Sequence, residues 1–309
     1  MPNDHYLPQF YLRNFGIPRK PAFVWSYIRN GNPREKAIKS VASIDDLYTL
    51  TNAPPEVNHR ALDGEFQKIE TAAAPIIKHL IKAKDADLPD GEREQLAIFL
   101  SLLANRTPFS SEKLKAGNLN METKTMELMA RNDEFFNAIV SDLPESKREE
   151  MIKNREVLKN ASKHFTLEYE DEEEARRHFL GLSLSAMDEV TAIFLFKSWV
   201  IFESDSSRVF VTCDNPVAMV PPEDYPPSMG LGFLQANVLF PLSPDLCLYM
   251  SNKTVKRGLV KAKREYMDEI NQRVIYSAYK YVYSNIASKD IQRIFDQTKE
   301  GDNTKNAWL

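Results

Sequence analysis

The chain has 309 residues, of which 43% are apolar and 27% charged, and its formal net charge is −4. This composition is ordinary for a folded protein with a sizeable core, and it argues against a generally basic, nucleic-acid-binding surface while leaving room for a local basic pocket. The two cysteines, Cys213 and Cys247, lie in apolar stretches and are too few for a disulfide framework. Asp4 and His5 come early with no apolar run after them, and the longest apolar run, residues 192–196, is too short to span a bilayer. We therefore expect a reduced, cytoplasmic protein with no membrane partner.

The first sixty residues predict a short helix followed by strands. Pro8 suits a first helical position and Gly16 suits a helix end. Residues 23–28 are rich in aromatic and β-branched side chains and predict a strand, and shorter strands are expected at 37–42 and 47–50.

Residues 61–108 predict two amphipathic core helices. Apolar side chains recur at steps of three and four over 61–84, where Pro75 is expected to kink the helix. The second helix covers about 92–106, with Leu96, Phe99 and Leu103 on one face, and it ends before Pro108.

Residues 109–197 predict a charged, largely helical segment. Its methionine stripe, Met121, Met126 and Met129, favours a loosely packed core over a docking surface. The acidic run at 170–177 suits the start of a helix that continues to about Lys197.

Residues 198–252 predict antiparallel strands: a hairpin of 199–202 with 208–212, and two strands near 237–241 and 246–250. Residues 253–298 hold a long helix over 261–280 and a short one near 289–298, and 299–309 is expected to be a mobile tail. Helices and strands are segregated, so the pattern predicts one α+β domain over 1–309: an antiparallel sheet of short strands, a largely helical middle and a C-terminal helix.

His5 is the first candidate for chemistry. If a helix begins at Pro8, the imidazole lies beside the free N–H groups of that helix start, where a neutral histidine near a bound anion could act as a general base. The alternative is that His5 only caps the entry of the chain through a hydrogen bond.

Glu70 and Arg106 break the rule that charged side chains point outward, because each falls on or beside the apolar face of its helix. A charge on an inward face is either paired or lines a pocket. We predict that the two pair with each other, and the pattern leaves open whether the pair is structural or belongs to a site in which Arg106 grips an anion.

Two turns carry the remaining polar candidates. Asp214 and Asn215 follow a predicted strand and precede Pro216, and Ser243 lies between two prolines. Polar groups at strand ends can serve catalysis or metal binding, but Asp and Asn are also common turn formers. The histidines are scattered, and no zinc-spaced pair, phosphate-binding glycine loop or serine elbow is present in the sequence.

These motifs together resemble a bacterial family known as domain of unknown function 4238. The likeness rests on His5 to Phe15 (HYLPQFYLRNF), the helix with Glu65 and Glu70 followed by residues 72–75, Arg106-Thr107-Pro108, Asp214 to Val217 and Pro241 to Pro244. It runs from about residue 4 to residue 285. The family usually has Ser where this chain has Cys213, which puts a nucleophilic hydroxyl there in doubt, since a small packed residue suits both.

The resemblance implies a shared site at the motif positions, and we add Ser243 to it. We predict a hydrolase or transferase, nuclease-like in character, that acts on an anionic substrate such as nucleic acid or a nucleotide. His5 would be the base, Asp214 would orient it or hold a divalent metal, and Asn215 would assist. Gln9, Glu70, Arg106 and Ser243 would bind substrate. The alternative is a non-catalytic module that binds a protein partner through the helical segment 110–165.

Overall fold

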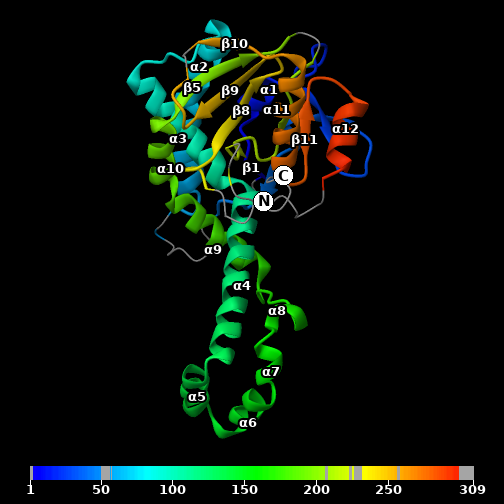
Figure 1. The fold of residues 1–309 in the computed structure, drawn as a ribbon. Coiled ribbons are helices and arrows are strands. Elements are labelled where there is room, and N and C mark those ends of the chain that lie inside the picture. The colour runs from blue at the N-terminus through cyan, green and yellow to red at the C-terminus, as the bar shows by residue number, and fades with distance from the viewer. Residues whose placement is uncertain are drawn as a thin grey trace. The chain divides into compact units, whose positions relative to one another are not determined.

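The computed structural model describes residues 3–49, 56, 58–205, 208–222, 225, 232–255 and 258–298. The chain folds as α+β, with helices and strands segregated along the sequence as predicted (Figure 1). It divides into unit 1, residues 1–109 with 182–309, and unit 2, residues 110–181. The predicted tail at 299–309 lies outside the described residues.

The N-terminal segment of unit 1 starts with a strand. β1 (Asn3–His5) pairs antiparallel with β4 (Ser43–Asp45), and the helix α1 (Gln9–Arg13) follows. The strand predicted at 23–28 is confirmed as β2 (Phe23–Tyr27), which pairs with β3 (Arg34–Ala37). The strand predicted at 37–42 is wrong, because the backbone turns into a short 3₁₀ helix at Ile38–Ser40. Residues 47–49 form no strand either, and Leu50 lies outside the described residues.

The main sheet of unit 1 has five strands, in the order β10-β5-β9-β8-β7. Their bounds are Leu259–Lys261, Ser198–Glu203, Leu246–Ser251, Asn237–Ser243 and Ala218–Val220. The pairs are antiparallel except β10 with β5. The two strands predicted near 237–250 are confirmed as the hairpin β8–β9, whose register shifts between Pro241 and Ser243. Proline has no N–H to donate to a ladder, which fits this irregularity.

A second sheet has four strands in the order β3-β2-β11-β6, with β11 at Val282–Ser284 and β6 at Thr212–Cys213. The hairpin predicted from 199–202 and 208–212 is wrong. β5 pairs with β9 in one sheet, whereas β6 pairs with β11 in the other. The chain between β5 and β6 therefore passes from one sheet to the next.

The helices α2 (Ala61–Ala83) and α3 (Asp90–Arg106) confirm the two predicted core helices, and α2 continues through Pro75. The helix predicted to reach Lys197 is instead two helices, α9 (Glu172–Ser185) and α10 (Met187–Phe196). α11 (Arg264–Ser277) and α12 (Lys289–Asp296) are the predicted C-terminal helices.

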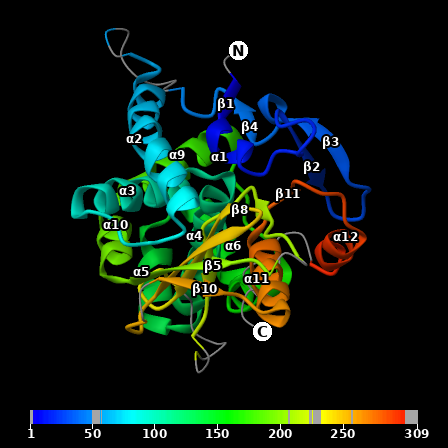
Figure 2. The same ribbon diagram turned by 90° about the horizontal axis from the view of Figure 1, so that it is seen from above.

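Helices cover the sheets of unit 1 on opposite sides. α2, α3 and α10 lie on one side of the five-stranded sheet, and α11 lies on the other, with α12 packed beside α11 (Figure 2). α11 contributes Met267, Ile270, Val274 and Ile275 to a core that also takes in side chains of both sheets and of α12. This core holds β6 and the turn after it against α11.

Unit 2 is helical and has a small core. α4 (Pro108–Arg131) leads into four shorter helices, α5 to α8, at Asp133–Asp142, Glu145–Lys153, Arg155–Leu158 and Ala161–His164. Its buried apolar cluster consists of Ala130, Phe136 and Val140, with Met151 and Leu158 beside it. The predicted methionine stripe is exposed and does not form a core.

Candidate functional site

The N-terminal strand is tied down by a buried carboxylate. Asp4 accepts hydrogen bonds from Arg60 Nη2 at 2.5 Å, from Arg60 Nη1 at 2.9 Å and from the backbone N–H of Tyr48 at 2.9 Å. Burial alone would raise the pKa of Asp4, but the bonds from Arg60 and Tyr48 outweigh it and lower the pKa. Asp4 is thus an ionised anchor that brings the segment around Tyr48 onto β1.

Arg106 lies at the end of α3 and is 1% exposed. Its Nη1 donates to Glu70 Oε1 at 2.8 Å, and its Nε donates to the carbonyl oxygen of Tyr6 at 2.9 Å. The predicted Glu70–Arg106 pair is confirmed. Two of the three guanidinium nitrogens are therefore fixed, one by a helix and one by the N-terminal segment.

The third nitrogen, Arg106 Nη2, is buried and has no hydrogen-bond partner in the described part of the chain. The hydroxyl of Tyr48 is in the same condition. Burial raises the pKa of Tyr48, while the charge of Arg106 acts against that rise and the charge of Glu70 adds to it. We call Tyr6, Tyr48, Glu70 and Arg106 the Arg106 cluster; it holds two buried donors that nothing in the described chain satisfies.

Tyr6 links this cluster to the Asp214 turn. Burial raises the pKa of Tyr6, and the carboxylate of Asp214 is the next largest cause of the rise, ahead of the neighbouring hydroxyls of Tyr281 and Tyr48. Tyr283 in β11 is influenced by Tyr6 and Asp214 in the same way, and its buried hydroxyl has no partner among the described residues. Buried tyrosines therefore run from Arg106 towards Asp214.

Asp214 itself is buried and fully engaged. Its Oδ1 accepts the N–H of Tyr279 at 2.7 Å, and its Oδ2 accepts those of Lys280 at 2.7 Å and Tyr281 at 2.9 Å. Burial raises its pKa to about 6, although the three backbone bonds oppose the rise. The carboxylate shapes the turn before β11, and it receives its bonds from that turn and not from His5.

Asn215 joins the same turn to the end of α11. Its Nδ2 donates to the carbonyl oxygen of Ser277 at 3.1 Å, and Ser277 Oγ returns a bond to the Asn215 carbonyl oxygen at 3.0 Å.

Burial raises the pKa of the Cys213 thiol to about 12, so it stays protonated and is no thiolate nucleophile at neutral pH.

His5 lies at the end of the strand that leads into α1. It is the last residue of β1, opposite Ser43, and α1 begins four residues later with Pro8 as its N-cap. Its Nε2 is buried and has no hydrogen-bond partner among the described residues.

The other two predicted substrate ligands make local bonds. Gln9 Oε1 accepts from Arg13 Nη2 at 3.3 Å, and Ser243 Oγ accepts the N–H of Asp245 at 3.3 Å. The contacts thus join Glu70 to Arg106, and Asp214 and Asn215 to the ends of α11 and the next turn. The catalytic and binding roles assigned to all seven residues stay predictions.

Sequence reasoning missed Asp4, Tyr6, Tyr48 and Arg60. No sequence pattern marks Asp4, because its burial depends on the pairing of β1 with β4 and on Arg60. Arg60 follows a proline-rich stretch in which apolar residues do not recur at helical spacing, so no local pattern marks it. Tyrosine suits both core and site, and its hydroxyl partner depends on the tertiary fold.

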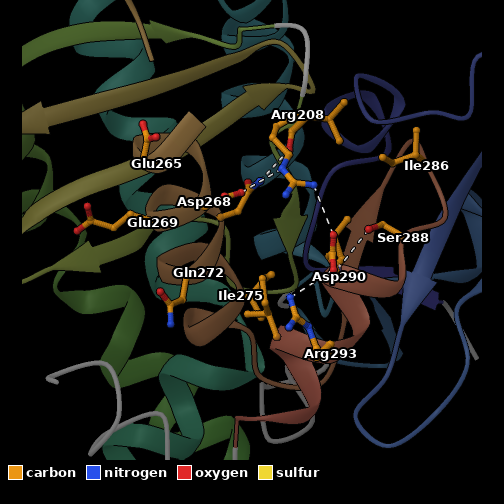
Figure 3. A pocket seen from close by; sticks show the side chains of 14 residues that line it. Arg208, Glu265, Asp268, Glu269, Gln272, Ile275, Ile286, Ser288, Asp290 and Arg293 are labelled. Carbon is orange, nitrogen blue, oxygen red and sulfur yellow. Dashed lines mark hydrogen bonds and ion pairs between the residues drawn. The ribbon is translucent and has the colours of Figure 1, made fainter. Parts of the chain in front are cut away.

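A groove with a volume of about 700 Å³ lies elsewhere in unit 1, between α11 and α12 (Figure 3). Arg208 crosses it, with Nε 3.2 Å from Asp268 and Nη1 3.5 Å from Asp290, which Arg293 also contacts at 3.3 Å. None of the seven predicted site residues lines this groove. Arg208 thereby connects Asp268 of α11 to Asp290 of α12.

The described residues contain no group of three or more His, Cys, Asp or Glu side chains placed to hold a metal ion. No single helix there is long and apolar enough to cross a bilayer, and one bent pair, α9 with α10, meets the criteria by length and composition only.

The fold and the buried polar motifs define an α+β protein whose N-terminal strand, central helices and β6 turn are joined by polar side chains. A family model described as "Protein of unknown function (DUF4238)" matches residues 3–288. The chain belongs to this family, as its motifs indicated. No curated protein and no solved structure matches the chain.

Proposed function

We propose that the chain is a bacterial cytoplasmic enzyme, a hydrolase or transferase, that acts on a small anionic substrate of the nucleotide class. The observation that carries the proposal is Arg106, whose buried guanidinium is held by Glu70 and Tyr6 and still presents Nη2 without a partner. A buried donor without an acceptor costs about 1–3 kcal/mol, more when it is charged. A bound anion removes that cost.

The chemistry of the Arg106 cluster favours an anion. Arg106 Nη2 and the Tyr48 hydroxyl are both donors, and a phosphate or carboxylate oxygen accepts from both. Both donors are buried, and in the ion pair the Glu70 side chain is 23% exposed against 1% for Arg106. Such depth suits the terminal group of a small molecule better than the backbone of a nucleic acid.

His5 remains our candidate for the proton acceptor. Its Nε2 carries no hydrogen bond within the described chain, so it is available to take a proton from an attacking water or hydroxyl. Asp214 acts differently in this proposal from the sequence expectation: it positions the turn at Tyr279–Tyr281 and does not orient the imidazole.

The experiment combines a substrate panel with a hydroxyl deletion. The full chain is incubated with nucleoside phosphates, with and without divalent cations, and released phosphate is measured. In parallel, the rise in melting temperature on adding phosphate is recorded for wild type and Tyr48→Phe. We expect the wild type to turn over a compound of the panel and His5→Ala to abolish this turnover. We also expect phosphate to raise the melting temperature of the wild type and not that of Tyr48→Phe.

The matched control is Tyr276→Phe, which removes a hydroxyl that accepts from Gln272 Nε2 at 2.7 Å. It should leave both turnover and thermal shift unchanged. If no compound in the panel is turned over and Tyr48→Phe keeps the full phosphate shift, the Arg106 cluster holds ordered water and the proposal fails.

A second candidate, a protein-interaction module, is favoured by one feature of unit 2. On α4, Leu114, Met121 and Leu128 recur every seven residues and are 42%, 65% and 67% exposed. Apolar residues at heptad spacing on one helix form a narrow seam that fits a partner helix. The docking segment of this candidate is therefore α4.

Site-specific photo-cross-linking in cells tests this candidate. A cross-linker at Leu128 is compared with one at Glu149, an exposed polar position of the same unit. A discrete product at 128 and none at 149 supports a helix-docking partner, identified by mass spectrometry. Equal or diffuse products at both positions would rule out the seam as an interface.

A further inference from the structure

A second groove of unit 1 lies against the five-stranded sheet and has a volume of about 530 Å³, which is the size of a site for a small organic ligand. Its walls come from β5, β8 and β9 on one side and from α11 on the other. Phe202, Leu239 and Tyr249 supply the sheet side, and Tyr266, Ile270 and Arg273 supply the helix side. It shares no residue with the Arg106 cluster.

The floor of this groove is aromatic and apolar. The rings of Phe202 and Tyr249 pack with centroids 5.4 Å apart and planes 41° apart, and Tyr266 stands exposed at the rim. Such a surface takes up a flat or extended apolar body, because aromatic faces give large contact area with little conformational freedom to lose.

The rim is positively charged in a chain whose net charge is −4. Lys261, Lys263 and Arg273 line the groove, against one acid, Glu269. The Arg273–Glu269 contact is long, at 3.9 Å, and Glu269 is itself largely exposed, so this pair leaves the cation poorly neutralised. The groove therefore favours an anionic ligand.

Arg273 also supplies a specific contact point. Its Nη1 is buried and has no hydrogen-bond partner in the described chain, although the residue lines the groove. A guanidinium nitrogen in that state is satisfied by a carboxylate, sulfonate or phosphate oxygen.

We propose that this groove binds a small amphipathic anion, with its apolar body on Phe202 and Tyr249 and its anionic head at Arg273. The site is separate from the one proposed for catalysis, and its ligand is an acyl carboxylate or an aromatic phosphate. Both sources share the same chemistry, an apolar body of limited length with one anionic end.

The full chain is titrated with 1-anilinonaphthalene-8-sulfonate, an aromatic anion whose fluorescence rises on binding. One binding site per chain is expected, with affinity about tenfold lower for Arg273→Gln, since each lost charge-assisted contact is worth roughly that factor. Lys261→Glu changes an exposed side chain outside the core and is expected to weaken binding as well, which covers the case that Arg273→Gln fails to fold. Arg293→Gln, in the neighbouring groove, is the matched control and should bind as wild type does.

Competition then identifies the source of the ligand. Displacement of the probe by decanoate assigns the groove to acyl carboxylates, and displacement by a nucleoside monophosphate assigns it to aromatic phosphates. Either result supports the proposal. Unsaturable binding, or equal affinity in wild type, Arg273→Gln and Lys261→Glu, would overturn it without bearing on the Arg106 cluster.

Discussion

Arg106 shows what a single residue contributes to this fold. Its charge is removed from water and is compensated by Glu70, a residue thirty-six positions earlier on α2. The pairing of Arg106 with Glu70 could be predicted from the positions of the two residues on their helices, because a charged residue on an apolar helix face needs a partner. The neutral hydroxyls of Tyr6 and Tyr48 could not, because nothing in a local pattern separates a packed tyrosine from one that faces a site.

Replacing Glu70 by glutamine should lower the free energy of unfolding by about 3 kcal/mol, at the lower end for a broken buried pair, because Glu70 is partly exposed. The control on the same helix is Glu65→Gln. Its partner Lys68 is exposed, and loss of this surface pair should cost less than about 1 kcal/mol. Urea unfolding measures both, and equal effects would contradict a buried role for Glu70.

Asp214 should make stability depend on pH. Its pKa in the folded protein, about 6, lies above the ordinary value of 3.8, so the folded state binds more protons than the unfolded chain between these values. The contribution of Asp214 to the free energy of unfolding is therefore present at low pH and is lost as pH rises through about 6.

The measurement compares wild type with Asp214→Asn by urea unfolding from pH 4 to 8. As the pH rises to about 6, the free energy of unfolding of the wild type should fall relative to that of the variant. Above pH 7 the difference between the two free energies should stay constant. A difference that is constant over the whole range would show that the carboxylate titrates with an ordinary pKa.

At the scale of elements, α1 joins the four-stranded and five-stranded sheets of unit 1. Tyr11 bonds Thr212 Oγ1 of β6 at 2.6 Å and the Pro241 carbonyl oxygen of β8 at 2.9 Å, and its ring stacks on Phe240. A five-residue helix has little stability of its own, so this contact and its neighbours hold it in place.

Tyr11→Phe should lower the free energy of unfolding by about 1–3 kcal/mol, because the Pro241 carbonyl oxygen loses its donor and the Thr212 hydroxyl loses its acceptor. Tyr48→Phe is the contrasting substitution. It removes a buried hydroxyl without a partner among the described residues, so it should leave the free energy of unfolding unchanged or raise it. In thermal and urea unfolding, Tyr11→Phe should therefore lose stability and Tyr48→Phe should lose none; an equal loss in both would contradict the assignment.

Elements with a long, regular pattern could be predicted, and short ones defined by distant partners could not. The helices near 61–84 and 92–106 carry a clear helical period, and β8 with β9 forms a local hairpin. β6 has two residues, and its partner β11 lies some seventy residues later, so local alternation wrongly assigned it to β5. The same holds for the site: inward charges were visible, whereas the turn held by Asp214 depends on residues 279–281.

At the scale of the whole molecule, the units differ in how much core they have. Unit 1 buries a large cluster between its sheets and α11, whereas unit 2 relies on Ala130, Phe136 and Val140 with two partly buried neighbours. Local opening is easiest where few apolar contacts must be broken.

Limited proteolysis should therefore cut first within residues 110–165 or in the C-terminal segment after residue 298, and only later within 198–250. Fragments identified by mass spectrometry at early times measure the order. Early cuts inside the β-strand region 198–250 would contradict the assignment of unit 2 as the less stable part.

The pairing of Tyr27 with Val282 has a consequence for how the protein is made. Unit 2 is one continuous stretch and leaves the ribosome complete, but unit 1 waits for β11, the last strand in the described chain, to close its four-stranded sheet. Until then the nascent chain presents β2 and β6 with open edges, which are templates for wrong pairing. A messenger truncated before codon 282 would thus yield a product that needs a chaperone to stay in solution.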